Sequence, residues 1–159
     1  MRLKVSMGEG EIKERLVFRG DNLTKSEPLV LEGFHVLNEV VIDRGPSPYS
    51  TTLDLYIDNN KFTSIVGDGI IISTPTGSTA YNLSAGGSIV QANTQCILVT
   101  PLAPHSLSFR PLILPASAEI KLQKPFDGRS AAWVSLDGAT RFMLSEGETL
   151  VVKASVHPL

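Results

Sequence analysis

The sequence is poor in the features that mark secreted, membrane-spanning or nucleic-acid-binding proteins. It contains one cysteine, Cys96, so no disulfide can form within the chain. Its apolar runs are far shorter than the roughly 20 residues that cross a bilayer, and no charged-then-apolar leader opens it. A formal net charge of −2 argues against nucleic acid or an anionic membrane surface as a partner. We therefore expect a cytoplasmic globular protein that binds neither nucleic acid nor membranes.

What the sequence does contain is the composition of a folded domain with its own core. Hydrophobic residues make up 42% of the 159 positions and charged residues 19%, which is ordinary for globular proteins. Cys96 begins the apolar run CILV, so we expect a buried packing thiol, as suits a reducing compartment. A chain of this length buries about two-thirds of its unfolded surface. We therefore expect residues 1–159 to form a single domain.

Two hairpins are predicted from alternating polar and apolar residues around turn signals. The first joins residues 2–6 to residues 12–18 through the sequence GEG. The second joins residues 51–57 to residues 61–66 through the sequence DNN.

The remaining pattern is mostly one of short strands. Residues 20–28 are polar and predict an exposed loop, whereas the apolar residues 29–42 fit helix or strand equally. Further short strands are predicted at residues 96–101, 112–114, 118–123, 131–136, 141–144 and 149–155. Many short strands separated by turn signals predict a mainly β, sandwich-like fold with one or two short helices.

The most informative stretch is residues 67–81, which read GDGIIISTPTGSTAY. Three isoleucines predict a buried strand, after which a turn rich in hydroxyl groups leads into a short helix that stops at GG, residues 86–87. Free backbone N–H groups beside several hydroxyls form a cradle that suits a polar ligand. The alternative is an ordinary capped helix after a strand.

Two further stretches accompany this one. Asn38 and Glu39 lie in LNEVVIDRG, residues 37–45, and PHSLSFRP fills residues 104–111. Together and in this order, the three stretches closely resemble the signature of the NAD kinase family. The resemblance runs along nearly the whole chain but covers only the C-terminal part of such an enzyme, a β-rich domain that follows an α/β domain.

The resemblance implies an enzyme that transfers the γ-phosphoryl group of ATP to the 2′-hydroxyl of the adenosine ribose of NAD, giving NADP. Such a transfer needs positioned substrates, a base for the hydroxyl and a divalent cation, here Mg²⁺ arriving with ATP. The family's catalytic aspartate belongs to a Gly-Gly-Asp-Gly motif of the preceding domain, and that motif is absent from this sequence. We therefore expect no catalytic residue in this chain, with Asp68 no substitute, and Met1 need not be the natural start.

The resemblance also implies most of a dinucleotide site. Asn38 offers amide donors and an acceptor, and the carboxylate of Glu39 suits a ribose diol. Tyr81 can stack on a ring while its hydroxyl stays in water. For Asn38 and Glu39 the alternative role is local backbone bonding, and for Tyr81 it is core packing. The further residues implied for NAD binding are Asp68, Thr76, Thr79, Ala80 and Ser84.

The third stretch is less specific. Arg110 could contact a phosphate through paired hydrogen bonds, or it could pin its own loop. His105 fits a loop histidine that is satisfied by a neighbour better than it fits a catalyst. No Cys/His or paired-carboxylate spacing suggests a bound metal, so none is expected in the chain itself.

Three functions fit these residues. The first is the NAD-binding part of a NAD kinase, which the resemblance implies to be a homo-oligomer assembled through this domain. The second is a non-catalytic dinucleotide-binding module with the same pocket. The third is a lipid kinase of related architecture, which would have an apolar acyl pocket in place of the turn at residues 76–81.

Overall fold

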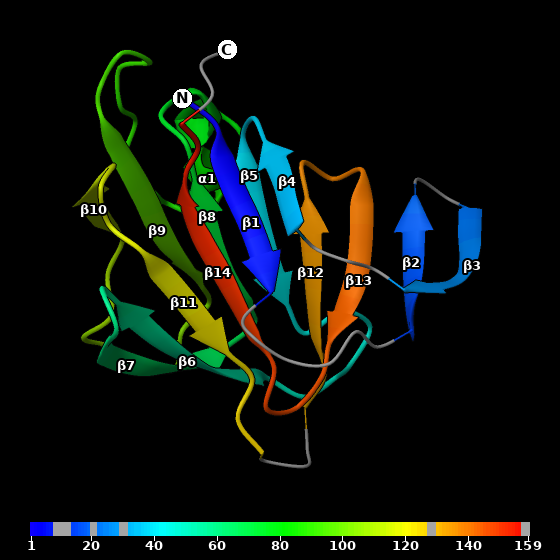
Figure 1. Ribbon diagram of the computed structural model, residues 1–159. Helices are drawn as coiled ribbons and strands as arrows, with labels where there is room; N and C mark the ends of the chain where they lie inside the picture. The colour runs from blue at the N-terminus through cyan, green and yellow to red at the C-terminus, as the bar shows by residue number, and fades with distance from the viewer. Residues whose placement is uncertain (8–13, 20–21, 29–31, 127–129, 157–159) are drawn as a thin grey trace.

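Two antiparallel sheets form the framework of the protein (Figure 1). The computed structural model describes residues 1–7, 14–19, 22–28, 32–126 and 130–156. The six-stranded sheet contains, in spatial order, β4 (Glu32–Val36), β1 (Leu3–Met7), β14 (Thr149–Ala154), β11 (Ile120–Gln123), β6 (Thr51–Ile57) and β7 (Asn60–Gly67). The eight-stranded sheet contains β10 (Leu112–Pro115), β9 (Cys96–Leu102), β8 (Gly69–Ser73), β5 (Glu39–Asp43), β12 (Ala132–Leu136), β13 (Thr140–Leu144), β2 (Glu14–Arg19) and β3 (Asn22–Pro28).

The main core lies between the two sheets. Strand β6 alternates buried and half-buried residues, so that Leu53 and Leu55 point inward as a sheet with one covered face requires. Opposite them, Ile70 and Ile72 of β8 join the same hydrophobic cluster. Two antiparallel sheets around one such cluster confirm the mainly β, sandwich-like fold that the sequence predicts.

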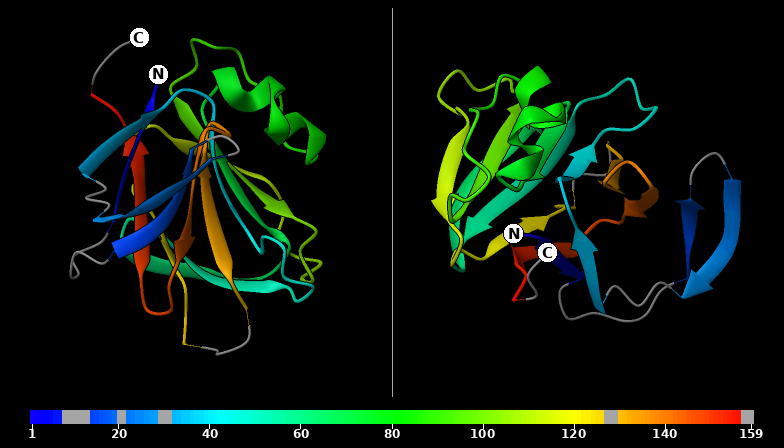
Figure 2. Two further views of the ribbon diagram at one scale, coloured as in Figure 1. Left: turned by 90° about the vertical axis from the view of Figure 1, so that its right-hand side faces the viewer. Right: turned by 90° about the horizontal axis from the view of Figure 1, so that it is seen from above.

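Strand β8 is buried along its whole length because its second face is covered too. Ile71 points away from the main core and packs with Val41 and Leu102, and Ala85 covers them. Ala85 directly follows two helical turns, η1 (Thr76–Thr79) and α1 (Tyr81–Ser84), which lie against the outside of the eight-stranded sheet (Figure 2). This outer layer is where the hydroxyl-rich turn of the sequence is found.

Several local predictions are confirmed. Strands β6 and β7 form the second hairpin, and its turn residues Asp58 and Asn59 adopt positive φ values of 50° and 65°. For residues 29–42, where the sequence fits helix or strand equally, the structure shows strand β4 and all but the last residue of β5. Cys96 is buried, as expected of a packing thiol.

The first predicted hairpin is wrong. Strand β1 pairs with β14 and β4 in one sheet, whereas β2 pairs with β13 and β3 in the other. The alternation of β1 identifies a strand with a buried face, where Leu3 and Val5 are inaccessible, but it does not identify the partner strand. The GEG segment between them lies outside the described residues.

The loop predicted at residues 20–28 is also wrong, because Asn22–Pro28 forms strand β3. This strand lies at the end of the eight-stranded sheet and pairs only with β2 among the described strands. An edge strand need not be apolar, and polar or charged residues and proline are common there. The polar sequence of this edge strand is therefore hard to distinguish from that of a loop.

Candidate functional site

The chain passes from the six-stranded to the eight-stranded sheet at Leu37 and Asn38, between β4 and β5. The carboxylate of Asp137 accepts three consecutive N–H groups here, at 2.7 Å from Leu37, 2.8 Å from Asn38 and 3.1 Å from Glu39. On the other side, the Thr74 hydroxyl donates to the Leu37 carbonyl at 2.7 Å, and the Thr74 N–H donates to the Asn38 carbonyl at 2.9 Å. The backbone of this crossing is thus fixed from two sides.

Thr74 also organises the hydroxyl-rich turn that follows β8. Its Oγ1 lies 2.9 Å from Thr76 Oγ1 and accepts the N–H of Gly77 at 3.0 Å. Gly77 packs directly on the crossing, since a Cβ there would lie 2.3 Å from the carbonyl oxygen of Asn38. Only glycine fits so close to another backbone. The turn and the crossing therefore form one rigid unit.

Helix α1 is fixed to the sheet by Asn82. The amide of Asn82 donates to the carbonyls of Ser78 and Ser88, each at 3.1 Å, and its Oδ1 accepts the hydroxyl of Thr100 on β9 at 2.7 Å. Asn82, Ser78 and Thr100 are fully buried, so these bonds offset the cost of removing polar groups from water. They leave Tyr81 and Ser84 on the exposed side of the helix.

Glu39 lies at the start of β5, where its carboxyl group meets the first N–H of α1. Burial and the nearby charge of Asp137 raise the pKa of Glu39 above its ordinary value, and the bond from the Tyr81 N–H offsets this only in part. Its Oε2 atom is buried and has no hydrogen-bond partner among the described residues. An unpaired buried carboxyl oxygen is costly in a folded protein, and a ligand hydroxyl is one group that could satisfy it.

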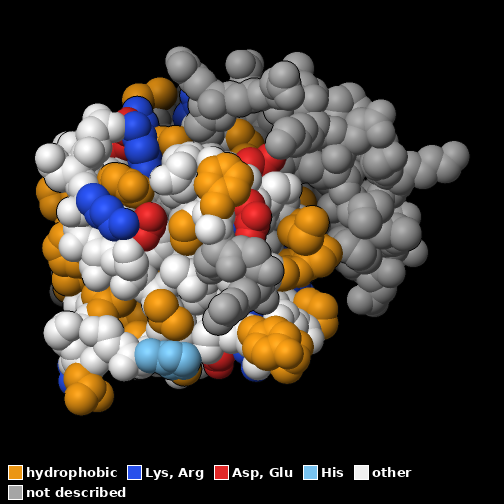
Figure 3. Space-filling model, turned by 90° about the horizontal axis from the view of Figure 1, so that it is seen from below, with side chains coloured by type: hydrophobic (Ala, Val, Ile, Leu, Met, Phe, Trp, Pro, Cys, Tyr) orange, Lys and Arg blue, Asp and Glu red, His pale blue; other side chains and the backbone are white. Residues whose placement is uncertain are grey.

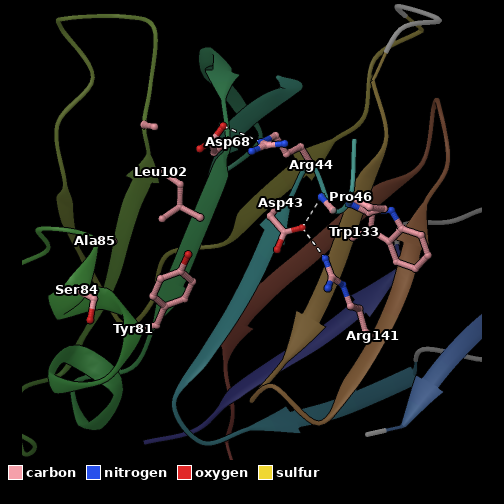
Figure 4. Close-up of a pocket in the computed structure, with 12 residues that line it drawn as sticks. Asp43, Arg44, Pro46, Asp68, Tyr81, Ser84, Ala85, Leu102, Trp133 and Arg141 are labelled. Carbon is pink, nitrogen blue, oxygen red and sulfur yellow. Dashed lines mark hydrogen bonds and ion pairs between the residues drawn. The ribbon is translucent and has the colours of Figure 1, made fainter. Parts of the chain in front are cut away.

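A cleft of about 890 Å³ opens between α1 and the ends of β5 and β12 (Figure 4). Tyr81, Ser84 and Ala85 line it on the helix side, and Leu102 forms part of its apolar floor. Its opposite side consists of Asp43, Arg44, Gly45, Pro46, Trp133 and Arg141, with Asp68 and Ala103 completing the lining. The cleft thus combines an apolar floor with two aromatic rings and charged side chains.

The charged side chains of the cleft are paired. Arg44 Nε donates to Asp68 Oδ1 at 2.9 Å, and an Arg141 terminal nitrogen donates to Asp43 Oδ1 at 2.8 Å. The guanidinium of Arg141 also lies 5.5 Å from the centre of the Trp133 ring, within cation–π range. The pairing holds these side chains in place and balances the charges of the wall, so this side of the cleft is polar without strong net charge.

Comparison with known proteins decides the family. The family model of the ATP-NAD kinase C-terminal domain matches residues 37–159, well over half of the chain. The chain belongs to this family. The resemblance drawn from the three sequence stretches is therefore confirmed.

The individual relatives of this NAD kinase C-terminal domain are much longer proteins. The chain is 55% identical over 126 residues to the probable NAD kinase 2, chloroplastic, of Oryza sativa subsp. japonica, covering 79% of this chain and 13% of that protein. It is 49% identical over 127 residues to the NAD(+) kinase of Saccharomyces cerevisiae, covering 80% of this chain and 24% of that protein. The chain thus spans a quarter or less of these two relatives.

Solved structures agree with the fold. The crystal structure of yeast NADH kinase complexed with NADH matches with a TM-score of 0.78 and 37% identity, covering 98% of this chain and 40% of that one. The NAD kinase from Archaeoglobus fulgidus in complex with ATP matches with a TM-score of 0.69 and 23% identity, covering 98% and 53%. The second likeness is one of fold alone.

The residues that the family resemblance implies fall into two neighbouring groups in this NAD kinase C-terminal domain. Asp68, Tyr81 and Ser84 line the cleft. The second group surrounds the crossing and its turn, and consists of Asn38, Glu39, Thr76, Thr79 and Ala80. Glu39 connects the two groups through its bond with the Tyr81 N–H.

The third stretch lies apart from the cleft lining. Arg110 is exposed and follows Phe109, whose buried ring packs 6.4 Å from that of Phe62. His105 Nε2 lies 3.1 Å from Ser50 Oγ, the kind of bond expected of a satisfied loop histidine. Phe109 therefore anchors this loop.

Sequence reasoning missed several residues of the site. Asp43 could have been found from the period of two in a strand, because Glu39, Val41 and Asp43 share the face of β5 that turns away from the main core. Trp133 and Arg141 lie in the cleft because β12 pairs with both β5 and β13, and no local sequence pattern reveals this pairing. Asp137 lies in an Asp-Gly turn between β12 and β13, and its local sequence predicts no more than a turn.

Two negative findings concern the described residues only. They contain no group of three or more His, Cys, Asp or Glu side chains arranged to hold a metal ion. None of their helices is long and apolar enough to cross a membrane.

Proposed function

We propose that this chain is the dinucleotide-binding part of a NAD kinase. In the complete protein, the γ-phosphoryl group of ATP passes to the 2′-hydroxyl of the adenosine ribose of NAD, giving NADP. One observation carries the proposal: three residues implied for dinucleotide binding, Asp68, Tyr81 and Ser84, line a cleft of about 890 Å³, a volume that suits a ligand of this size. Glu39, bonded to the Tyr81 N–H, connects this cleft to the other implied residues. Membership of the family, stated above, supports the same reaction.

The chemistry of the gathered groups suits the two halves of a dinucleotide. The unpaired Glu39 Oε2 can accept a hydrogen bond from a ribose hydroxyl, and the amide of Asn38 has both donors and an acceptor for a base edge. Tyr81 is 46% exposed, so its ring is available for stacking on a base. Thr76, Thr79 and Ala80 supply hydroxyl and backbone groups from the adjoining turn.

The catalytic step needs more than this chain. The sequence lacks the Gly-Gly-Asp-Gly motif that carries the family's catalytic aspartate, and Asp68 is committed to its pair with Arg44. The described residues offer no ligand group that fits a resident metal, so we assign Mg²⁺ to the phosphates of ATP. What this chain contributes to phosphoryl transfer is the position of the acceptor ribose.

Three further features belong to the proposal. Residues 1–159 form one domain, which is supported by the main hydrophobic cluster, whose described members extend from Leu3 to Val152. The domain assembles into a homo-oligomer. The compartment is the cytoplasm, a reducing environment that suits a lone buried thiol at Cys96.

The proposal is tested by titrating the 159-residue chain with NAD and with NADP while following the fluorescence of Trp133. This residue is the only tryptophan in the sequence and lines the cleft. We expect saturable binding of both dinucleotides and no ATP-dependent formation of NADP by the chain alone. Vesicles containing diacylglycerol serve as the control ligand for a lipid kinase and should leave the fluorescence unchanged.

The complete protein distinguishes the enzyme from a non-catalytic module. ATP-dependent conversion of NAD to NADP supports the kinase, whereas binding without conversion supports the module. Absence of saturable binding to either dinucleotide contradicts both. Rapid NADP formation by the 159-residue chain would place the base within it.

A further inference from the structure

One partner of residues 37–39, where the chain crosses between the sheets, lies about 100 positions away in the sequence: Asp137, in the turn between β12 and β13. The register of the sheet explains why it arrives there. Leu136 pairs with Val40, so the residue after Leu136 lies beside the residue before Val40, which is Glu39. The N–H of Asp137 donates to the Glu39 carbonyl at 3.0 Å, so its backbone is bonded to the same segment that its carboxylate holds.

The conformation of Asp137 is specialised for this contact. Its φ of +46° is in the left-handed region, which asparagine and aspartate tolerate better than most residues. From this position its two carboxylate oxygens receive three consecutive N–H groups within 3.1 Å. Successive N–H groups that converge in this way form an anion-binding nest, and charge-assisted bonds are stronger than neutral ones. Here the anion is a side chain of the protein itself.

The crossing needs these bonds because it lies between the sheets. Leu37 and Asn38 belong to neither β4 nor β5, so their N–H groups have no partner strand. Without the Asp137 carboxylate, the three adjacent N–H groups would have to form hydrogen bonds with water, or the backbone of this segment would have to change conformation. The side chains of Asn38 and Glu39 project from this same backbone, and their directions depend on its conformation.

We propose that Asp137 is a positioning residue, whose carboxylate holds the backbone of residues 37–39 so that the side chains of Asn38 and Glu39 meet the dinucleotide. Asp137 does not line the cleft, so it acts through these two residues. The inference rests on the proposed function, in which Asn38 and Glu39 contact NAD.

The test uses Asp137→Asn, which keeps size and tolerance of positive φ but places an amide donor against the nest. Asp58→Asn is the matched control: Asp58 also has positive φ, 50°, in a hairpin turn, and its Oδ1 accepts the Glu119 N–H at 2.9 Å. It lies on the six-stranded sheet and does not line the cleft. Asp137→Gly, which takes positive φ without strain, is a second variant if the first folds poorly.

The readout is the NADP affinity of the 159-residue chain by calorimetry, with a thermal melt of each variant. Loss of at least one charge-assisted bond should weaken binding about tenfold in Asp137→Asn. Asp58→Asn should lower the melting temperature without changing affinity. In the complete protein, Asp137→Asn should raise KM for NAD while leaving KM for ATP unchanged. A residue with a merely structural role would instead lower the folded fraction, with unchanged affinity of the folded molecules.

A double-mutant cycle with Asn38→Ala shows whether Asp137 acts through Asn38. The double variant should lose less affinity than the product of the two single losses, because one of the two side chains that Asp137 positions is already gone. If the two losses multiply in full, or if Asp137→Asn binds as tightly as the parent while Asn38→Ala does not, the inference is overturned and the proposed function stands. If Asn38→Ala itself leaves affinity unchanged, the proposed dinucleotide site is overturned as well.

Discussion

At the scale of single residues, Glu39 is a carboxyl group in surroundings that disfavour its charge. Burial, followed by the charge of Asp137, raises its pKa above the ordinary 4.5. The folded state therefore binds a proton at Glu39 more tightly than the unfolded state does. This group contributes most to stability below pH 4.5, and that contribution is lost as the pH rises through the raised pKa of the folded state.

Glu39→Gln removes this pH dependence because glutamine keeps the size of the protonated form. We expect the melting temperature of the variant, relative to the parent, to rise as the pH increases from about 4 to about 7.5. Glu119→Gln is a control of opposite sign: Lys153 and Lys121 lower the pKa of Glu119, so its charge stabilises the fold above pH 4.5. Melting curves over this range measure both differences. A shift for Glu39→Gln that does not vary with pH contradicts the assignment.

The residues that could be predicted from the sequence are those whose role is local. Asn38, Glu39 and Tyr81 can be proposed from the sequence because each lies in a short stretch that resembles the family signature, and the burial of Cys96 is predicted by its apolar neighbours. Asp137 was not found, because an Asp-Gly turn has the same appearance whether or not its carboxylate binds a distant backbone. Arg141 was missed for a similar reason, since its partner Asp43 is far away in the sequence.

At the scale of elements, hairpins were predictable only where the turn itself specifies the pairing. Asp58 and Asn59 favour the positive φ values that join β6 to β7 in register. Among the described strands, β1 pairs with β14, which is distant in sequence, and with β4, which is separated from it by the β2–β3 pair. Alternation shows that a strand has one buried face, and it carries no information about which edge it will join.

The turn between β8 and α1 yields a prediction at this scale. Gly77→Ala would bring a Cβ within 2.3 Å of the Asn38 carbonyl oxygen, so the turn and the crossing must separate. We expect a loss of about 1–3 kcal/mol of unfolding free energy. NADP affinity should also fall, because Asn38 and the turn move relative to each other.

Gly86→Asn is the matched control for this substitution. Gly86 follows α1 with φ of +81°, and nothing lies within 4 Å of a Cβ at this position. Asparagine tolerates left-handed φ, so this variant should keep nearly parental stability and affinity. Chemical denaturation and calorimetry on both variants make the comparison. A Gly77→Ala variant as stable as Gly86→Asn would show that the backbone of residues 37 and 38 can move away from the turn at little cost in free energy.

For the whole molecule, the distribution of apolar side chains on the surface bears on whether the chain assembles with copies of itself. Several large apolar side chains are exposed, among them Leu107 at 85%, Phe126 at 82% and Tyr49 at 68%. On the described part of the face in Figure 3, hydrophobic side chains stand singly or in small groups among charged ones. Scattered apolar residues are common on monomers, so the surface alone does not determine the oligomeric state.

The cleft gives a more specific reason to expect assembly. Asp68 and Tyr81 belong to its lining, yet the side chain of Asp68 is 51% exposed and Tyr81 is 46% exposed. Partly open walls leave room for a neighbouring subunit to complete the pocket, as the family resemblance implies. A pocket shared between subunits binds its ligand only in the assembled state, and assembly is then linked to ligand binding.

We therefore expect a homo-oligomer whose NADP affinity falls when the protein is diluted below the dissociation constant of the oligomer. Light scattering with and without NADP measures the assembly, and binding isotherms across a dilution series measure the coupling. Tyr81→Ala should weaken binding and assembly together, because the ring lies on the open side of the cleft. Leu107→Ala, outside the cleft lining, tests whether the exposed loop takes part in assembly alone. A monomer at every concentration, with constant affinity for NADP, would show that the cleft is complete within one chain.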